Sequence, residues 1–359
     1  ENVLAAARRA AAISNPDDGS NGWVVAAARS TSGHALLAND PHLGLTAPGT
    51  WMLVSLKAPG FRLAGATAPG VPAVILGHNG RIAWGLTNAE TDASDVYVET
   101  VDPADPDRYL APDGPRPFET RRETIQVRFG RDREIVVRRT RHGPVVSDEL
   151  DGAPAGTALA LAHTGLLPHE ASAEAIFRVN RAGDWPAFRR ALGHAQAPQQ
   201  NAFYAGPDGV GLVTMAALPI RRNGTGYMPA DGRTTDGDWI GFAGLEAMPQ
   251  TFRPARGWAA NANNTLAADD YPIRLGEEWG YPGRIARIEE VLTAGGPFDL
   301  DALQALQLDD RSTIASALLP AMLEAVADAE LSASAQGLID RLGAWDGRTA
   351  TEAAEPLVF

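Results

Sequence analysis

The sequence predicts an α+β protein built from antiparallel strands, and three observations favour this fold class. From Trp23 onward, short runs of β-favouring residues are separated by Gly, Pro and Asn, which is typical of strands joined by turns. These runs follow one another without the helices that parallel βαβ units require. After Trp279, apolar residues recur at helical spacing instead. We therefore expect stacked antiparallel sheets followed by helices.

The N-terminal third is expected to begin with a helix end and to continue as strands. Residues 1–13 are rich in Ala and Arg and predict the last turns of a helix, which Pro16 and Gly19 bring to an end. The strands that follow are expected at 23–28, 35–38, 50–57, 72–76 and 81–87.

Residues 95–165 predict a β-rich extension, with a hairpin between Thr124–Phe129 and Arg133–Arg139. Two helices are expected next, at 170–181 and 184–194, the second with Asp184 as its N-cap. Strands at 202–205 and 210–217, and helices at 285–292, 300–308 and 315–326, complete the expected elements. Pro320 is expected to kink or restart the last helix.

Composition narrows the classes of function. The 359 residues allow one large or two ordinary domains, and 45% apolar residues suffice for a core. With 31 Lys and Arg against 44 Asp and Glu, the net charge is −13, the wrong sign for binding nucleic acid or an anionic membrane. The absence of cysteine excludes disulfides and thiolate chemistry. No apolar run is long enough to span a bilayer.

Ser20 is the candidate nucleophile. A serine hydroxyl needs a base to take its proton, and the string Asp18-Gly19-Ser20-Asn21-Gly22 does not fit the Gly-x-Ser-x-Gly elbow that supplies one through histidine. The serine's own α-amine is an alternative base, because a free α-amino group titrates near ~8. Using it requires cleavage of the Gly19–Ser20 bond. Without further motifs, the same string is also typical of a polar loop that precedes a strand.

Further motifs follow Ser20 at fixed distances: Asn39-Asp40-Pro41-His42-Leu43, Gly77-His78-Asn79-Gly80-Arg81-Ile82-Ala83-Trp84-Gly85 and Asn261-Ala262-Asn263-Asn264. Together with Ser20-Asn21 they resemble the penicillin acylase family of N-terminal-nucleophile hydrolases. The resemblance implies an αββα sandwich of antiparallel sheets and a precursor that cuts itself before Ser20. Residues 1–19 would then be the end of an upstream subunit or spacer. Residues 20–359 would be a β-subunit, incomplete at its C-terminus.

The same resemblance implies a set of catalytic residues. The backbone N–H of Asn88 and the side-chain amide of Asn263 would stabilise the oxyanion, and Arg284 would hold Asn263 in place. His42 would hold the amine of Ser20. Each has a plainer interpretation: a polar turn for the Asn-rich string, a solvated helix start for Arg284 and a structural side chain for His42. A Ser-His-Asp triad that includes Asp40 is not supported, since nothing in the sequence shows that the pair reaches Ser20.

A structural calcium ion is also implied. Asp92-Ala93-Ser94-Asp95 resembles the calcium-binding stretch of the family, and Asp92, Asp95 and the Ser94 carbonyl offer the hard oxygens that Ca²⁺ prefers. One further family carboxylate has no clear counterpart, so a solvated acidic loop is the alternative. No organic cofactor is expected. The string His142-Gly143-Pro144-Val145 is interpreted as turn structure.

The predicted function is hydrolysis of an N-acyl amide through an acyl-Ser20 intermediate. The expected substrate is a penicillin- or cephalosporin-type amide, with an N-acyl homoserine lactone or a lipopeptide as alternatives. The expected partner is the upstream α-subunit of the same precursor, and the expected location is the periplasm or outside the cell. A non-enzymatic β-rich binding domain would explain the strands and the acidity. It would not explain Ser20, His42, Asn263 and Arg284 together.

Overall fold

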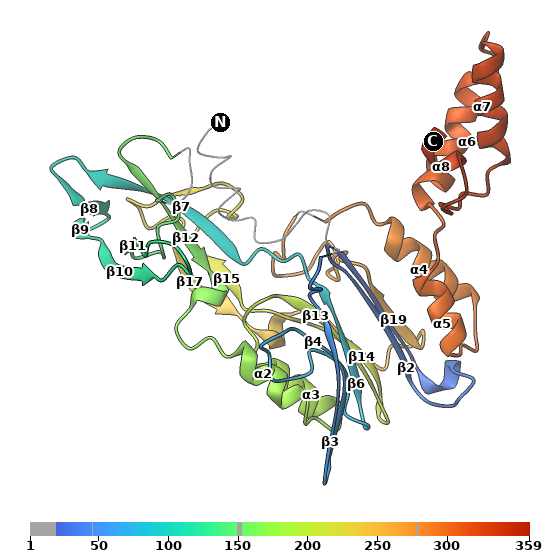
Figure 1. Ribbon diagram of the computed structural model, residues 1–359, viewed down its shortest axis with the longest axis horizontal. Helices are drawn as coiled ribbons and strands as arrows, with labels where there is room; N and C mark the ends of the chain where they lie inside the picture. The colour runs from blue at the N-terminus through green and yellow to red at the C-terminus, as the bar shows by residue number, and fades with distance from the viewer. Residues whose placement is uncertain (1–18, 45, 149–152, 278) are drawn as a thin grey trace.

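The computed structural model describes residues 19–44, 46–148, 153–277 and 279–359. Strands occupy most of the chain as far as Asn261, and helices follow it, so the predicted α+β class is confirmed (Figure 1). The helix expected at 1–13 lies outside the described residues.

The strand that carries Ser20 lies in the middle of a small antiparallel sheet. The order of this sheet is β19–β1–β2. Its strands are β1 (Gly19–Val25), β2 (Leu36–His42) and β19 (Trp258–Asn261). The register places Ser20 opposite Pro41 and Gly22 opposite Asn261. The central strand therefore brings the start of the described chain beside a segment more than 230 residues later.

A second antiparallel sheet has seven strands in the order β18–β14–β13–β6–β5–β4–β3. Its strands are β3 (Met52–Ala58), β4 (Phe61–Thr67), β5 (Leu76–His78), β6 (Ala83–Asn88), β13 (Gln200–Gly206), β14 (Gly209–Met215) and β18 (Gln250–Phe252). Strand β6 ends at Asn88, which is one of the predicted catalytic residues.

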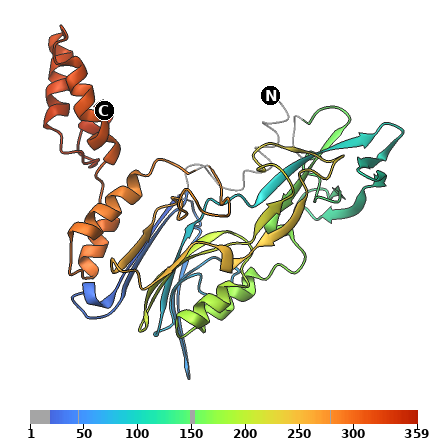
Figure 2. The same ribbon diagram turned by 180° about the vertical axis from the view of Figure 1, so that it is seen from behind.

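Buried side chains show how the two sheets and their helices are layered. Between the sheets, Val24 and Ala259 of the small sheet pack with Phe203 of the large one. On the outer face of the large sheet lie α2 (Ser172–Val179) and α3 (Trp185–Leu192), which pack against it through residues such as Phe188. On the outer face of the small sheet lie α4 (Gly283–Ala294) and α5 (Leu300–Gln307). Figures 1 and 2 show the two helix pairs on opposite sides of the paired sheets.

The β-rich extension forms further sheets on one side of the molecule and is larger than the expected range 95–165, because strands between residues 218 and 243 pack with it. Its strands are β7 (Ser94–Asp102), β8 (Asp105–Ala111), β9 (Gly114–Pro117), β10 (Glu119–Ile125), β11 (Arg133–Arg139), β12 (Thr157–His163), β15 (Leu218–Arg221), β16 (Ala230–Asp231) and β17 (Trp239–Ala243). The expected hairpin forms between β10 and β11, although its strands pair from Glu119 to Arg139 and its turn is longer than predicted.

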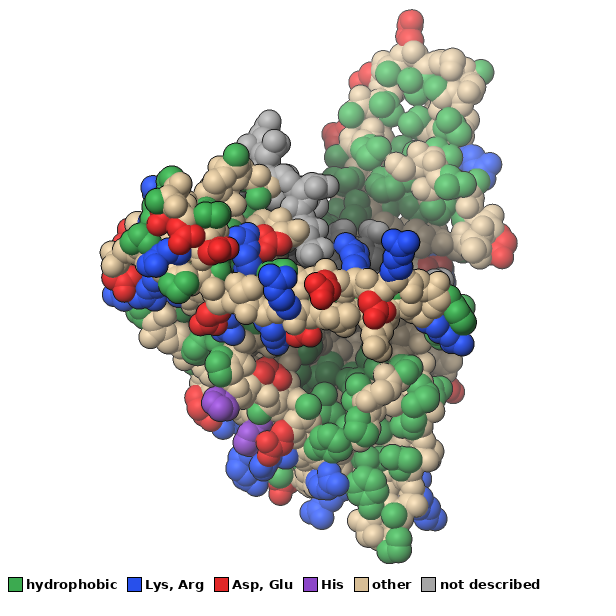
Figure 3. Space-filling view, turned by 60° about the vertical axis from the view of Figure 1, so that its left-hand side comes forward, with side chains coloured by type: hydrophobic (Ala, Val, Ile, Leu, Met, Phe, Trp, Pro, Cys, Tyr) green, Lys and Arg blue, Asp and Glu red, His purple; other side chains and the backbone are tan. Residues whose placement is uncertain are grey.

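The C-terminal helices project from the body (Figure 1). They are α6 (Thr313–Val326), α7 (Ala333–Ala344) and α8 (Glu355–Val358). Leu318 and Met322 of α6 are exposed, as are Met52 and Leu53 of β3. Figure 3 shows hydrophobic side chains on the projecting helices at the top and on the lowest part of the molecule. Among the described residues, no helix combines the length and the apolar character needed to cross a membrane.

Several predicted elements need correction. The strand expected at 72–76 is wrong in position, because β5 begins only at Leu76. The backbone of Val74 bonds instead to the side chain of Asn180, which accepts from its N–H at 2.8 Å and donates to its carbonyl at 2.7 Å. Helix α6 also runs through Pro320 as one element rather than restarting there. The helix at 184–194 is confirmed as α3, with Asp184 capping it by accepting from the N–H of Ala187 at 2.8 Å.

Gly22 lies where the two sheets approach each other most tightly, and this gives a test of the layering. A Cβ at this position would overlap the ring of Phe203, which is fully buried. We expect Gly22→Ala to lower the free energy of unfolding of the full-length protein by about 1–3 kcal/mol, the usual cost of overpacking. Denaturant melts measure it. Gly280→Ala is the control, because a Cβ there meets nothing within 4 Å. Equal melts for Gly22→Ala and the parent would contradict this layering.

Candidate active site

Ser20 lies on β1 and is buried, with 9% of its surface exposed. Its nitrogen is a peptide nitrogen, joined to Gly19, and occupies the position that a free α-amine would take after cleavage of that bond. The Ser20 N–H donates a hydrogen bond of 2.6 Å to Oδ1 of Asn263. The predicted nucleophile and the predicted oxyanion residue are therefore in direct contact.

The carboxamide of Asn263 is fixed on both sides. Its Oδ1 accepts from the Ser20 N–H and also from Nη2 of Arg284 at 3.0 Å, so this atom must be the oxygen. Its Nδ2 donates to the Asn88 carbonyl at 2.9 Å. Because a carboxamide nitrogen carries two hydrogens, a second one remains for another acceptor. Asn263 has a φ of +63°, a left-handed conformation that Asn adopts more readily than most residues.

Asn88 presents its backbone N–H away from the neighbouring strand. It lies opposite Gln200 in the β6–β13 ladder, and the following N–H, of Ala89, donates to the Gln199 carbonyl at 3.2 Å. In an antiparallel ladder the bonding direction alternates from residue to residue, so the Asn88 N–H faces away from β13. The N–H of Asn88 and the amide of Asn263 are thus held together next to Ser20.

Arg284 links three of these groups from the first turn of α4. Its Nη1 donates to the Ser20 carbonyl at 2.9 Å and to Oδ1 of Asn21 at 2.7 Å, in addition to the bond to Asn263. Burial lowers the pKa of its guanidinium from the ordinary value, while the carboxylates of Asp40 and Glu90 act in the opposite direction. The rigid fork of a guanidinium suits this bridging position.

His42 lies beside the Gly19–Ser20 bond. It is opposite Gly19 in the β1–β2 ladder, and its Nε2 is 3.1 Å from Oδ2 of Asp40 and 3.4 Å from Nδ2 of Asn21. In the part of the chain that the structure describes, no hydrogen bond joins His42 to the Ser20 hydroxyl. Asp40 and His42 form a pair, as their shared face predicts, but the arrangement is not a Ser-His-Asp triad.

A buried amide network under the site escaped sequence analysis. Oδ1 of Asn261 accepts from Oγ1 of Thr87 at 2.8 Å, from Nδ2 of Asn201 at 3.1 Å and from the N–H of Asn263 at 2.9 Å. Asn39 joins the two sheets, because its Nδ2 donates to carbonyls of Asn21 and Leu86. Asn39 and Asn261 both lie within the motifs quoted above. Their presence in those motifs was the available signal.

Ser20 opens into a cavity of about 450 Å³. We call this the Ser20 cavity. Its walls are mostly apolar and come from α2, α3, the large-sheet strands β5, β6, β13 and β14, and neighbouring loops; among them are Trp51, Leu76, Trp84, Ile176, Phe188 and Met215. Asn88, Glu90 and Gln200 are polar members of the lining. A cavity of this size and character accepts an apolar group of a small molecule, with the polar residues beside Ser20.

The Asp92–Asp95 stretch, expected to bind calcium, places both of its carboxylates beside a cation of the chain itself. Both carboxylates pair with Arg221, whose nitrogens are 3.0 Å from Asp92 and 2.8 Å from Asp95. The indole N–H of Trp239 also donates to Asp95. Over the described ranges, no group of three or more His, Asp or Glu side chains is placed to hold a metal ion. A guanidinium therefore neutralises the two carboxylates where an ion was expected.

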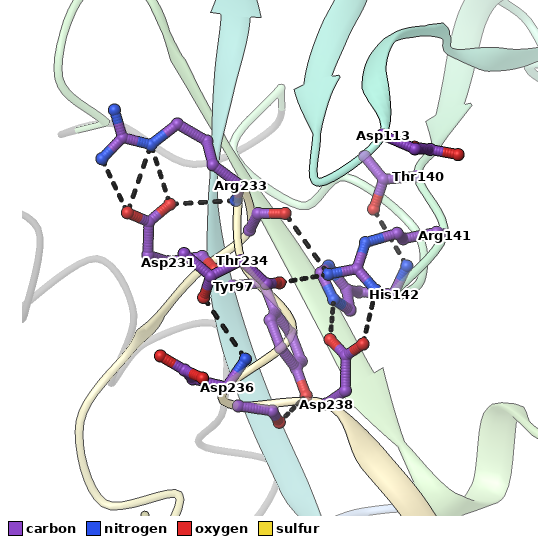
Figure 4. A network of polar contacts seen from close by, with 12 residues as sticks. Tyr97, Asp113, Thr140, Arg141, His142, Asp231, Arg233, Thr234, Asp236 and Asp238 are labelled. Carbon is purple, nitrogen blue, oxygen red and sulfur yellow. Dashed lines mark hydrogen bonds and ion pairs between the residues drawn. The ribbon is translucent and has the colours of Figure 1, made fainter. Parts of the chain in front are cut away.

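His142 belongs to a buried network within the extension rather than to a simple turn (Figure 4). Its ring stacks on Tyr97 at 3.6 Å between centroids. Nδ1 lies 2.7 Å from Glu99 and Nε2 lies 3.1 Å from Asp238, which also pairs with Arg141 at 2.8 Å. A larger cavity, of about 800 Å³, adjoins this network, but none of the predicted catalytic residues lines it.

The cluster around Ser20 brings together a buried serine, the carboxamide of Asn263, the backbone of Asn88 and an adjoining apolar cavity. The chain matches the penicillin amidase family over residues 2–359. It therefore belongs to the penicillin amidase family.

Similar proteins bear two kinds of name. The acyl-homoserine lactone acylase QuiP of Pseudomonas fluorescens (strain Pf0-1) is 31% identical over 354 residues, which cover 95% of this chain and 43% of that protein. The penicillin acylase 2 proenzyme of Pseudomonas sp. (strain SE83) is 34% identical over 341 residues, covering 92% and 42%. The chain thus spans less than half the length of these curated relatives.

Among solved structures, a thermostable penicillin G acylase from Alcaligenes faecalis is similar, with a TM-score of 0.79 and 29% identity. The match covers 92% of this chain and 60% of that one. The predicted family is confirmed, and the similar proteins are named as acylases.

The pairing of Arg221 can be tested through stability. Arg221→Ala would leave Asp95 buried, with 5% of its side chain exposed, and without its cation. We expect a loss of about 3–5 kcal/mol in the free energy of unfolding, the usual cost of breaking a buried pair. Arg233→Ala, which breaks an exposed pair with Asp231, is the control and should change little. If both variants melt like the parent, Arg221 does not neutralise the site. Melts with EDTA and with excess Ca²⁺ test whether an ion does.

Proposed function

We propose that the complete protein hydrolyses N-acyl amides through an acyl-Ser20 intermediate, and that it becomes active by cutting its own Gly19–Ser20 bond. The hydrogen bond of 2.6 Å between the Ser20 nitrogen and Oδ1 of Asn263 supports this proposal, because cleavage would leave the α-amine next to the carboxamide proposed to stabilise the oxyanion. The order helix pair, sheet, sheet, helix pair supports the αββα sandwich of an N-terminal-nucleophile hydrolase.

Activation would begin with attack of the Ser20 hydroxyl on the carbonyl carbon of Gly19. The C–N bond of the peptide breaks as the ester C–O bond forms, and the nitrogen takes up a proton to become an amine. Water then hydrolyses the ester, which leaves a carboxylate on Gly19 and restores the hydroxyl of Ser20. Arg284 donates a hydrogen bond to the Ser20 carbonyl, and Asn263 accepts one from the Ser20 nitrogen. Both contacts fix the backbone on the C-terminal side of the Gly19–Ser20 bond.

In catalysis the free amine of Ser20 would take the proton of its own hydroxyl as Oγ bonds to the substrate carbonyl carbon. The negative charge that develops on the carbonyl oxygen is stabilised by the Asn88 N–H and by Nδ2 of Asn263. The tetrahedral species then expels the leaving amine, which takes the proton from the α-amine. Water attacks the acyl-Ser20 ester by the same route and releases the acid.

The Ser20 cavity restricts the choice of acyl group more than the choice of leaving group. Its apolar walls favour an apolar acyl chain or ring, in keeping with a penicillin- or cephalosporin-type side-chain amide. An N-acyl homoserine lactone is the second candidate, because several similar proteins are named as acyl-homoserine lactone acylases. We also propose that an upstream α-subunit from the same precursor completes the site, and that the enzyme acts in the periplasm or outside the cell.

Cleavage at Gly19–Ser20 is the first test. In the full-length precursor, Ser20→Ala should leave one uncut chain, because processing requires the hydroxyl. Mass spectrometry and N-terminal sequencing of the purified protein measure it. Ser55→Ala, at an exposed position on β3, is the matched control and should be processed normally. A chain that begins at position 20 in the Ser20→Ala protein would show that cleavage is not autocatalytic.

The oxyanion site is the second test. Asn263→Gly removes the amide while accepting the φ of +63°, which Asn263→Ala would strain. We expect kcat for a chromogenic acyl anilide to fall by ~10²–10³, the usual cost of one lost oxyanion donor. Asn223→Gly, in an exposed loop, serves as the control. Near-normal turnover by a folded, processed Asn263→Gly enzyme would remove Asn263 from the mechanism.

A further inference from the structure

Glu90 is unusual in the lining of the Ser20 cavity. Among the described residues that line it, Glu90 is the one with a charged side chain, and most of the others are apolar. No salt bridge to Glu90 is found in the described ranges of the chain. Burial raises the pKa of its carboxyl, while the hydrogen bond from Asn88 and the charge of Arg284 act in the opposite direction. Burying an acidic group in an apolar wall costs free energy unless its oxygens find hydrogen-bond or charged partners.

The position of Glu90 is fixed at the reactive end of the cavity. Its Oε1 accepts from Nδ2 of Asn88 at 2.7 Å, and Oδ1 of Asn88 in turn accepts from Nε2 of Gln200 at 3.3 Å. Glu90 has a φ of +50°, a conformation uncommon for a side chain of its size. This chain of bonds ties the carboxylate to the same residue whose backbone N–H serves the oxyanion.

The remaining acceptor capacity of Glu90 is available to a ligand. A carboxylate offers about four lone-pair sites on two oxygens, and the Asn88 amide uses one of them. A ligand that places a hydrogen-bond donor beside the reacting carbonyl would meet this carboxylate. A purely apolar ligand would instead leave it desolvated and without a partner.

We propose that Glu90 is a specificity-determining residue that accepts a hydrogen bond from a donor on the acyl group, next to the scissile carbonyl. This inference rests on the proposed function. It narrows the substrate to amides of apolar acids that carry a hydroxyl or an ammonium group at the carbon beside the carbonyl. A substrate with an ammonium group is expected to form the strongest hydrogen bond to Glu90, since charge-assisted hydrogen bonds are roughly twice as strong as neutral ones.

Three matched substrates test the proposal with the processed full-length enzyme: the 4-nitroanilides of phenylacetic acid and of its 2-hydroxy and 2-amino derivatives. They differ only in the group that would face Glu90. In Glu90→Gln the amide oxygen still accepts from Asn88, which turns the –NH₂ group toward the cavity, donor against donor. We expect the ratio of kcat/KM for the 2-amino over the unsubstituted substrate to fall about tenfold or more, with a smaller fall for the 2-hydroxy substrate.

The ratio is the readout, because Glu90 also contacts Asn88 and its loss can slow all three reactions. Glu324→Gln, the same change at an exposed position on α6, is the control and should leave every ratio unchanged. An equal loss on all three substrates in Glu90→Gln would overturn the proposal and make Glu90 a positioning residue for Asn88. An unchanged ratio would overturn it as well.

Failure of the proposed function is distinguishable from failure of this inference. If the parent enzyme hydrolyses none of the three anilides, the result contradicts the proposed function. Calorimetric binding of phenylacetamide and of its 2-hydroxy and 2-amino derivatives then tests the role of Glu90 without catalysis. Tighter binding of the 2-amino derivative to the parent than to Glu90→Gln supports the Glu90 carboxylate as the group that recognises the donor on the acyl group. Equal binding overturns it.

Discussion

The hydrogen bond between the Ser20 nitrogen and the side chain of Asn263 is the contact on which the candidate site depends. It spans 243 positions of sequence and is shorter than most N–H···O bonds in proteins. Further contacts hold each partner: the β1–β2 ladder holds Ser20, the amide network around Asn261 holds Asn263, and Arg284 contacts both. The candidate nucleophile, the nitrogen proposed as its base and one proposed oxyanion donor are consequently brought together by a single contact.

Two features of the layers make this contact possible. Gly22 allows β1 to approach the ring of Phe203, and Asn39 joins the sheets because its side chain donates to the backbone carbonyls of Asn21 and Leu86. Both bring the end of β6, and hence Asn88, next to Ser20. The Ser20 cavity then lies against the large sheet and its helices α2 and α3. The packing of the two sheets therefore determines the geometry of the candidate site.

Sequence patterns anticipated much of this, but not the contacts between distant segments. The capped helix at Asp184 and the paired strands β13 and β14 follow from local signals. Strand β4 was missed because Ala64, Gly65 and Ala66 lack the β-branched character of a strand. The motifs named the residues around Ser20, whereas the pairing of Arg221 with Asp95 joins positions 126 apart and left no local signal. Glu90 was missed because a single acidic residue in a loop is ordinary until a cavity surrounds it.

The distance in sequence between the members of the site has a consequence for biogenesis. Arg284 contacts the Ser20 carbonyl across 264 positions, so the contact cannot exist until the chain has been synthesised at least as far as Arg284 and both sheets have formed. A precursor that cuts itself with these groups would remain intact while it is incompletely folded. Cleavage would then mark the chains that have folded correctly, and a misfolded chain would remain a single uncut polypeptide.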